Sequence, residues 1–282
     1  MKPIFAAALG FAGAAVVATA AAGAYMWSSS RPDTMAAPVT SAPFTLTATP
    51  DILAQFTPEQ RDAIGPIVRD YLLAHPEVLE EVVAELDRRR AAATAAQQSE
   101  ALVAQRDTLL NSDRQVVLGN PEGDVTLVEF FDYNCTYCRA AHRDLMRLLD
   151  EDPSLRVVLK EYPVLGQGSV EAAQVAIALN EVAPDRYLEF HDRVLREQGQ
   201  ANGNRALAIA DELGIDPLTI RAAMESPNVE ETISEVYELA TALGITGTPT
   251  YVLGNEVVVG AVGYDNLVGK IQQVRACGAT VC

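Results

Sequence analysis

The chain has 282 residues, of which 49% are hydrophobic, so it can build a substantial core in roughly one to three domains. Its 38 acidic side chains outnumber 21 basic ones, which gives a formal net charge of −17. This acidic balance argues against nucleic acid and anionic lipid surfaces as partners.

The first thirty residues predict an export segment. Residues 4–27 are almost entirely apolar, with Tyr25 and Trp27 at the far end, where an interface belt would lie. The run is longer than a signal-peptide core and matches the about 20 residues that span a bilayer. Against this, it is rich in alanine and glycine, and residues 18–20 offer a small-x-small cleavage site. We favour a membrane anchor for residues 1–30 over a cleaved signal peptide; either places the remainder outside the cytoplasm.

A linker and a helical arm are predicted to follow. Residues 31–55 are rich in Pro, Ser, Thr and Ala, a composition typical of a flexible linker. The run Thr57-Pro58-Glu59-Gln60 combines an N-cap, a first-turn proline and a capping-box partner. Apolar residues then recur at helical spacings, and Pro66 and Pro76 are expected to kink or divide the helix. We assign residues 56–112 to this arm.

The apolar stripe of the arm has two interpretations. It can pack back on the domain that follows, or it can pack on the same stripe of other copies. We favour self-association, because the arm precedes the domain and the alanine-rich stretch beyond Arg90 would hold it away.

A dithiol motif lies between a predicted strand, Val125–Phe131, and a predicted helix, Thr136–Leu149. Cys135 therefore stands where the helix begins, and unpaired backbone N–H groups and the helix dipole favour a thiolate there. Two intervening residues let Cys135 and Cys138 close a small disulfide. Read alone, the motif also fits a structural disulfide or half of a zinc site.

A proline further along the chain favours the redox interpretation. Pro249 opens a second apolar strand, with Gly247 two residues before it. Such a proline suits a cis bond in a tight loop, which in redox folds packs against the dithiol and pairs with a substrate peptide. The alternative is an ordinary trans proline at a strand start. The two motifs together, in this order, indicate a redox dithiol.

Residues 113–282 are predicted to form one α/β domain. Parallel strands need a crossover helix, and residues 136–149 supply one. Residues 168–243 are helix-patterned, with breaks at 214–217 and 226–227, which predicts a helical insertion. A final helix should begin at Tyr264. The predicted strands are residues 115–118, 125–131, 155–162, 251–253 and 256–259.

Three other polar residues lie near these elements. Glu129 stands among apolar strand neighbours, which predicts a partly buried carboxyl group with a partner or a raised pKa; a solvent-facing position is the alternative. Lys160 is its possible ion-pair partner, although a surface lysine is the favoured interpretation. His142, one helical turn beyond Cys138, would raise thiolate character if it faced the dithiol, but a solvated histidine is favoured.

Cys277 and Cys282 enclose four residues that include a glycine. A structural disulfide in an oxidising compartment is the favoured interpretation, with a second redox relay or a copper site as alternatives. A four-cysteine zinc site that includes the first motif is disfavoured, because this pair stands at the upper limit of the usual C-x2–4-C spacing and lacks the nearby loops of such sites.

Three segments of the chain resemble the DsbA family of thioredoxin-fold thiol-disulfide oxidoreductases. They are VTLVEFFDYNCTYCRAAHRDL, LRVVLKEYPVLG and LGITGTPTYVLGNEVVVGAVGYDNL. The segment FTPEQRDAIGPIVRDYLLAHPEVLEEVVAELDRRR is similar to the N-terminal helical region of ScsC-type (suppressor of copper sensitivity) members. The resemblance implies a thioredoxin fold with a helical insertion, preceded by an α-helical arm, and a trimer.

The resemblance also implies roles for individual residues. Tyr137 should tune the dithiol and offer an apolar contact to substrates. The Thr-Tyr dipeptide between the cysteines departs from the Pro-His of the most oxidising members, so the resemblance leaves the redox poise open. The implied catalytic residues are Cys135 as nucleophilic thiol, Cys138 as resolving thiol, Pro249 as cis-proline with Thr248 before it, and Glu129 as buried acid beneath the dithiol.

The expected function is thiol-disulfide exchange on secreted proteins, as oxidase or isomerase, on the periplasmic side of a bacterial inner membrane. A membrane redox partner would reoxidise or reduce the dithiol, and no cofactor is expected. The alternative is a periplasmic copper-sequestering protein that uses the same thiols, since soft thiolates select Cu(I). No GxGxxG, P-loop or Ser-His-Asp spacing indicates a nucleotide enzyme or a hydrolase.

Overall fold

The computed structural model describes residues 55–282. Residues 55–75 belong to one compact unit, and Pro76–Cys282 form a second. The predicted export segment and nearly all of the predicted linker lie outside the described residues. Across residues 55–282, none of the helices combines the length and the apolar character that a membrane span requires.

The first unit contains helix α2 (Pro58–Ala74). The predicted capping box is confirmed: the Thr57 side chain accepts the N–H of Gln60, whose side chain accepts the N–H of Thr57. The helix runs unbroken through Pro66 and ends before Pro76. Leu72 is half-buried, but the other large apolar side chains of this helix, together with that of the preceding Phe56, are exposed: Ile64, Ile67, Val68, Tyr71 and Leu73.

The second unit begins with α3 (Glu77–Ala104) and α4 (Arg106–Asn111). The first half of α3 carries an exposed apolar stripe, which consists of Leu79, Val82, Val83 and Leu86. Leu102 and Leu109, by contrast, are buried in a core cluster beneath the sheet. The last turns of the predicted arm are therefore part of the domain.

A five-stranded sheet forms the centre of the second unit, with the strand order β1-β3-β2-β4-β5. Strands β2 and β3 are parallel, α5 connects them as predicted, and the other pairs are antiparallel. The predicted strands are confirmed to within a residue at each end. The elements are β1 (Val116–Gly119), β2 (Val125–Phe131), α5 (Thr136–Glu151), β3 (Leu155–Glu161), β4 (Thr250–Leu253), β5 (Glu256–Val259) and α11 (Tyr264–Cys277).

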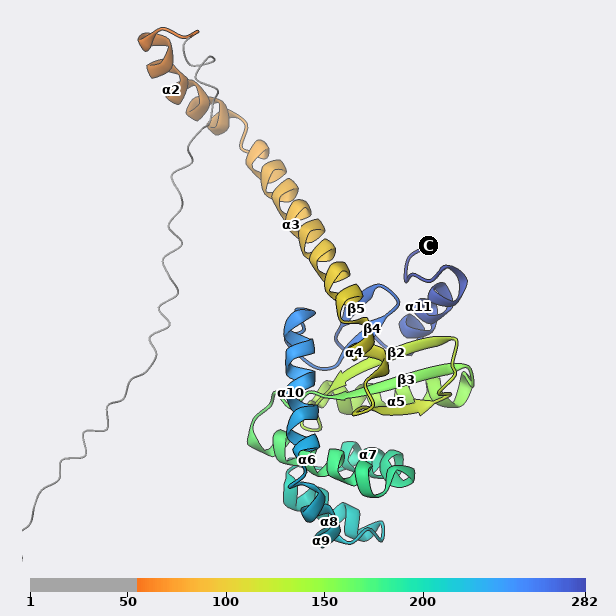
Figure 1. Ribbon diagram of the computed structural model, residues 1–282. Coiled ribbons are helices and arrows are strands. Elements are labelled where there is room, and N and C mark those ends of the chain that lie inside the picture. The colour runs from red at the N-terminus through yellow and green to blue at the C-terminus, as the bar shows by residue number, and fades with distance from the viewer. Residues whose placement is uncertain (1–54) are drawn as a thin grey trace, which may run out of the picture. The chain divides into compact units, whose positions relative to one another are not determined.

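The helical insertion between β3 and β4 is confirmed (Figure 1). Its helices begin where the sequence places caps: the side chain of Asp216 caps α9 and that of Ser226 caps α10. The insertion consists of α6 (Gln167–Val182), a 3-10 turn (Pro184–Arg186), α7 (Tyr187–Arg196), α8 (Gly203–Glu212), α9 (Pro217–Ala223) and α10 (Pro227–Ala242).

Helices cover both faces of the sheet. Leu127, Phe131 and Val157 point into the larger core, which α5, α11 and α6 to α9 complete. Val128 and Val158 point into the smaller core, which α10, α4 and the end of α3 cover. This arrangement follows from the period-two alternation of strands that are buried on both faces.

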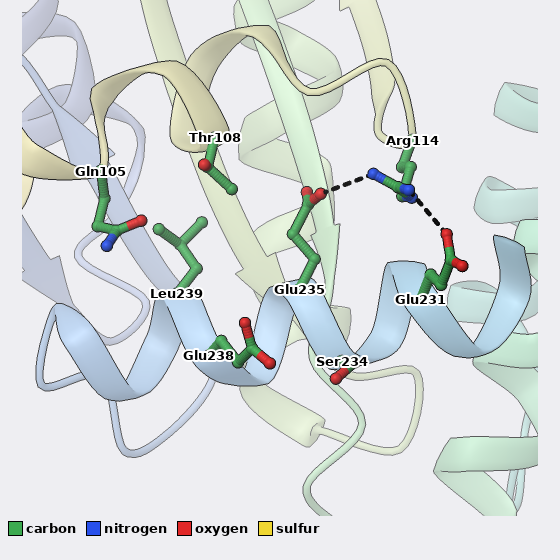
Figure 2. A pocket seen from close by; sticks show the side chains of 8 residues that line it. All are labelled: Gln105, Thr108, Arg114, Glu231, Ser234, Glu235, Glu238 and Leu239. Atoms are coloured by element: carbon green, nitrogen blue, oxygen red, sulfur yellow. Dashed lines mark hydrogen bonds and ion pairs between the residues drawn. The ribbon is translucent and has the colours of Figure 1, made fainter.

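Lys160 corrects the sequence analysis, because its side chain is fully buried and not at the surface. It shares the sheet face of Val158, so it lies under α4 and α10 and away from Glu129. Its ammonium group donates to the carbonyl oxygen of Thr108 at 2.9 Å and lies 3.9 Å from a carboxylate oxygen of Glu235. Figure 2 shows Glu235 on α10 opposite Thr108 and beside Arg114. The helices that cover this face of β3 are distant in the sequence, so no local signal around Lys160 indicates its burial.

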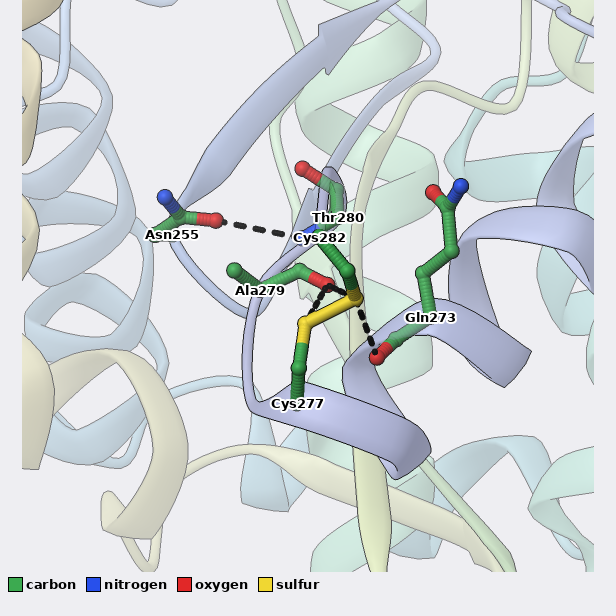
Figure 3. Close-up of a disulfide and its surroundings, with 6 residues drawn as sticks. All are labelled: Asn255, Gln273, Cys277, Ala279, Thr280 and Cys282. Carbon is green, nitrogen blue, oxygen red and sulfur yellow. Dashed lines mark hydrogen bonds between the residues drawn. A yellow bond between two sulfur atoms is a disulfide. The ribbon is translucent and has the colours of Figure 1, made fainter.

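The C-terminal cysteines form the predicted structural disulfide between Cys277 and Cys282 (Figure 3). The loop that it closes follows α11. Thr280 in this loop is buried, and its N–H donates to the side-chain oxygen of Asn255 at 3.3 Å. The disulfide therefore holds the tail against the turn between β4 and β5.

Candidate active site

Cys135 occupies the N-cap of α5, directly after β2 and its loop. Its sulfur accepts the backbone N–H of Cys138 at 3.4 Å. Both cysteines are buried, 5% and 1% exposed, and carry free thiols in this structure. The predicted placement of the dithiol at a helix N-terminus is thereby confirmed.

The proline loop packs against the dithiol. The Thr248–Pro249 peptide bond is cis, as expected. The Cys135 thiol donates to the carbonyl oxygen of Thr248 at 3.1 Å, so a residue 113 positions later in the chain contacts the first cysteine. The carbonyl oxygen of Pro249 accepts the N–H of Gly260, which fixes this loop against the strand that follows.

The two cysteines differ sharply in acidity. A hydrogen bond from the Cys138 thiol, with further hydrogen bonds from the Thr248 side chain and from the backbone N–H groups of Cys138 and Tyr137, lowers the pKa of Cys135 to about 5, against the effect of burial. Burial raises the pKa of Cys138 far above its ordinary value, and the hydrogen bond to Cys135 and the charge of Glu129 act in the same direction. The arrangement therefore offers one thiolate and one thiol at neutral pH.

Glu129 is buried on β2, as predicted, and is 3% exposed. Burial raises the pKa of its carboxyl group to about 8, against the effect of a hydrogen bond from Tyr251 on the neighbouring strand. The carboxyl group is thus mostly protonated at neutral pH, and its charge, when present, affects Cys138.

His142 corrects a second prediction, because its ring is 2% exposed and not solvated. Its Nε2 atom lies 2.8 Å from a carboxylate oxygen of Asp192 on α7. Its ring also packs edge-on against His191. Burial lowers the pKa of His142, so the ring is not a source of positive charge beside the thiols. The inserted helix α7 covers this face of α5, which the local pattern did not reveal.

A second buried carboxyl group was missed by sequence reasoning. Glu161 accepts hydrogen bonds from the hydroxyl groups of Tyr187 at 2.8 Å and Tyr133 at 3.2 Å. The Tyr133 hydroxyl also lies 3.2 Å from Nδ1 of His191. Burial raises the pKa of Glu161 to about 8. Its signal in the sequence is an acidic residue at the end of an apolar strand.

Asp132 and Arg139 were also missed. The Asp132 carboxylate is buried and accepts backbone N–H groups from the loop after β3. The Arg139 guanidinium donates to the carbonyl oxygens of Tyr133, Glu197 and Gly199, which links the loop before Cys135 to the α7–α8 connection. An aspartate three residues before a helix-initiating cysteine is a turn signal that could have found the first of these.

The exposed edge of the motif is formed by the dipeptide between the cysteines. Tyr137 is 69% exposed and offers an apolar ring beside the buried dithiol.

Within residues 55–282, no group of three or more His, Cys, Asp or Glu side chains is arranged to hold a metal ion.

Two family models match the chain. The model described as DSBA-like thioredoxin domain matches residues 126–272, more than half of the chain. The model described as copper resistance protein ScsC N-terminal domain matches residues 60–93, within α2 and α3.

Curated relatives match about half of the chain. The sodium/proton antiporter NhaA 1 of Salinispora arenicola is 31% identical over 144 residues, which are 50% of this chain and 22% of the antiporter. Disulfide bond formation protein D of Bacillus subtilis is 23% identical over 172 residues, 56% of this chain and 76% of that protein. The chain thus spans only about a fifth of the antiporter that it matches.

Some solved structures match the domain, and others match more of the chain. A thioredoxin-like oxidoreductase from Silicibacter pomeroyi is 42% identical, with a TM-score of 0.59, and covers 61% of this chain and 98% of its own. Proteus mirabilis ScsC in a transitional conformation is 28% identical, with a TM-score of 0.58, and the match covers 79% of this chain and 98% of the ScsC chain. A periplasmic thioredoxin-like protein from Salmonella enterica serovar Typhimurium is 27% identical, with a TM-score of 0.56, and the match covers 61% of this chain and 95% of that protein's chain.

Proposed function

Because the chain belongs to the family of DSBA-like thioredoxin domains, we propose that it catalyses thiol-disulfide exchange on secreted proteins, with Cys135 as the nucleophilic thiol and Cys138 as the resolving thiol. One observation carries the proposal: the Cys135 sulfur lies between the N-terminus of α5 and the Thr248 carbonyl oxygen, and its pKa is about 5. Cys138 lies deeper and remains a thiol.

The oxidising half-reaction begins with a disulfide between the two cysteines. A substrate thiolate attacks the Cys135 sulfur, the bond to Cys138 breaks, and Cys138 leaves as a thiolate that takes the proton held by Glu129. A second substrate thiolate then attacks the substrate sulfur of the mixed disulfide, and the Cys135 thiolate leaves. Two electrons pass from the substrate to the dithiol. Reduction follows the reverse order.

The acidity of Cys135 supports a role as oxidase or isomerase. A thiolate that is stable at neutral pH stabilises the reduced form of the dithiol, so the disulfide form tends to pass its bond to a substrate. A thiolate is also the better leaving group when the mixed disulfide resolves. The low pKa of Cys135 is therefore the observation that favours oxidation or shuffling over plain reduction.

The proline loop is proposed as the substrate-pairing element. Thr248 precedes the cis-proline and directs its carbonyl oxygen at the Cys135 sulfur. A substrate strand that pairs with this backbone would bring its own sulfur to Cys135. Tyr137, exposed beside the dithiol, would give the substrate an apolar contact.

The helical arm is proposed to assemble the chain into a homotrimer. Its apolar side chains on α2 and α3 are exposed in a single chain, and residues 60–93 match the ScsC N-terminal domain. An exposed stripe of this kind favours burial against another copy.

The proposed location is the periplasmic side of a bacterial inner membrane, with the apolar N-terminal segment as anchor or as cleaved signal. The Cys277–Cys282 disulfide supports an oxidising compartment. After a net oxidation or reduction of a substrate, a partner must return the Cys135–Cys138 pair to its starting redox state, and we assign that role to a membrane redox protein.

Copper binding is the second candidate function, favoured by the match of residues 60–93 to a copper resistance family. The free thiols of Cys135 and Cys138 supply two soft ligands for Cu(I). A Cu(I) titration of the wild type against Cys138→Ala separates the two functions. Sequestration requires binding alone, whereas exchange requires one reactive and one resolving thiol.

The test of the main proposal is selective alkylation of the reduced protein near pH 6, in a Cys277→Ala/Cys282→Ala background that leaves only the motif thiols. Cys135 should react and Cys138 should not, because activated thiols have pKa values of roughly 3.5–7.5 against about 8.5 for a free cysteine. Cys138→Ser should accumulate mixed disulfides on Cys135. Equal labelling of both cysteines would contradict the proposal.

A further inference from the structure

The Asp132 carboxylate is buried, with 1% of the residue exposed, and both of its oxygens accept hydrogen bonds. One oxygen accepts the N–H of Asn134 at 2.7 Å and the hydroxyl of Ser169 at 2.8 Å. The other accepts the N–H groups of Val164 at 2.8 Å and Leu165 at 3.0 Å. Four donors fill the four acceptor positions of a carboxylate, so hydrogen bonds stabilise its buried charge.

These hydrogen bonds stabilise the turn at residues 132–135, which ends at Cys135. The bond from the Asn134 N–H to the Asp132 side chain forms an Asx turn. The Cys135 N–H donates to the backbone carbonyl oxygen of Asp132 at 3.0 Å, which closes the same turn through the main chain. Asp132 therefore holds this turn through both its side chain and its main chain.

Asn134 extends the network to a third segment. Its side-chain amide donates to the Ser169 hydroxyl at 3.0 Å and to the Ala201 carbonyl oxygen at 2.9 Å, and its oxygen accepts the N–H of Ala201 at 2.7 Å. The turn before Cys135, the start of α6 and the residues before α8 are thus joined around one buried carboxylate.

We propose that Asp132 is a positioning residue that holds the Cys135 sulfur at the N-terminus of α5 and within reach of Thr248. The inference rests on the proposed function, in which Cys135 is the nucleophile. It acts through geometry: the thiolate is stabilised only while its sulfur faces the N–H of Cys138, and the Asp132 turn sets that orientation.

Asp132→Asn keeps the shape of the side chain but converts one acceptor oxygen into an N–H donor. With the amide nitrogen toward Val164 and Leu165, two backbone N–H groups lose their acceptor and face a donor. With the nitrogen toward Asn134, the N–H of Asn134 loses its acceptor, while the Ser169 hydroxyl can turn to accept. The turn should relax, and the Cys135 sulfur should leave its position at the helix N-terminus.

The experiment measures the pH dependence of Cys135 alkylation in the Cys277→Ala/Cys282→Ala background, together with the unfolding midpoint. Asp132→Asn should raise the pKa of Cys135 by about one unit, which is about a tenfold loss of thiolate below that pKa. Ser169→Ala, which removes one donor of the carboxylate, should shift the pKa the same way by less. Leu207→Ala in the core of α8 is the control, since it lowers stability without touching the turn.

The outcomes separate the two proposals. A wild-type Cys135 with an ordinary pKa removes the proposed function itself. A wild-type Cys135 with a low pKa that stays unchanged in Asp132→Asn and Ser169→Ala, while stability falls as in Leu207→Ala, overturns the positioning role alone. If Asp132→Asn does not fold, the Cys135 pKa of Ser169→Ala tests the positioning role: a raised pKa supports it, and an unchanged pKa overturns it.

Discussion

Glu129 should make stability depend on pH. Its folded pKa of about 8 lies above the ordinary glutamate pKa of 4.5, so the folded state retains a proton that the unfolded chain releases. That stabilisation is fully present below pH 4.5 and is lost as pH rises to about 8, at up to about 1.4 kcal/mol per unit. Glu129→Gln should flatten this decline in part, because Glu161 has a similar pKa and remains.

Urea unfolding between pH 5 and 8 checks this, on protein with the Cys135–Cys138 disulfide formed so that neither thiol titrates. Glu122→Gln, which alters an exposed carboxyl group, is the control. If the stability of Glu129→Gln declines with pH as steeply as that of the wild type, Glu129 is ionised in the folded state across this range.

The roles of Cys135 and Pro249 were predictable because a strand-helix junction and a strand start are local features of the sequence. The positions of Lys160 and His142 were predicted wrongly because α10 and α7 cover them, and the docking of those helices leaves no local periodicity. Asp132 was missed because most of its hydrogen-bond partners come from segments 32 to 37 residues away.

At the scale of elements, the C-terminal tail can be tested separately from the active site. The Cys277–Cys282 disulfide closes a short loop at the end of α11. Cys277→Ala/Cys282→Ala should lower the unfolding free energy by about 2 kcal/mol, the chain-entropy value for so small a loop. Exchange activity should stay at the wild-type level, because the loop contacts the β4–β5 turn and not the dithiol. A matching loss of exchange would instead favour a second redox relay.

Most elements were predictable because strands buried on both faces and capped helices leave strong local signals. The end of the arm was not. Helix α3 continues to Ala104, and Leu102 on it and Leu109 on α4 enter the smaller core, while Leu79 and Val83 stay exposed. The difference lies in tertiary packing, since the two buried leucines share the smaller core with side chains of the sheet.

For the whole molecule, the arm should determine assembly and isomerase activity. Without residues 1–90 the chain keeps Gln98, Leu102 and Leu109, which contact the domain. It should be a monomer that still exchanges model dithiols, but it should lose disulfide shuffling, because one substrate no longer meets several dithiols at high local concentration. Light scattering and a refolding assay for scrambled disulfides check both parts.

Charging the stripe should have the same effect as the deletion. Leu79→Asp with Val83→Asp places two carboxylates on exposed apolar positions that we propose to be buried in the assembly. Ala84→Asp with Ala91→Asp adds the same charge on the opposite side of α3 and should leave the assembly intact. The proposal is contradicted if the wild-type chain is monomeric at tens of micromolar, or if the truncated chain shuffles disulfides as well as the intact one. The chain would then be an oxidoreductase whose activity does not depend on assembly.

Because α3 is continuous, the direction in which its exposed apolar stripe faces around the helix axis is set by the number of residues in the helix. The stripe around Leu79 and Val83 and the buried Leu102 lie on one unbroken helix, so the direction in which the stripe faces is fixed relative to the sheet. Each residue inserted between them would turn the stripe by about 100° and advance it by about 1.5 Å. The length of the alanine-rich stretch is therefore a geometric parameter, and it sets how the dithiols of neighbouring copies would be oriented toward a shared substrate.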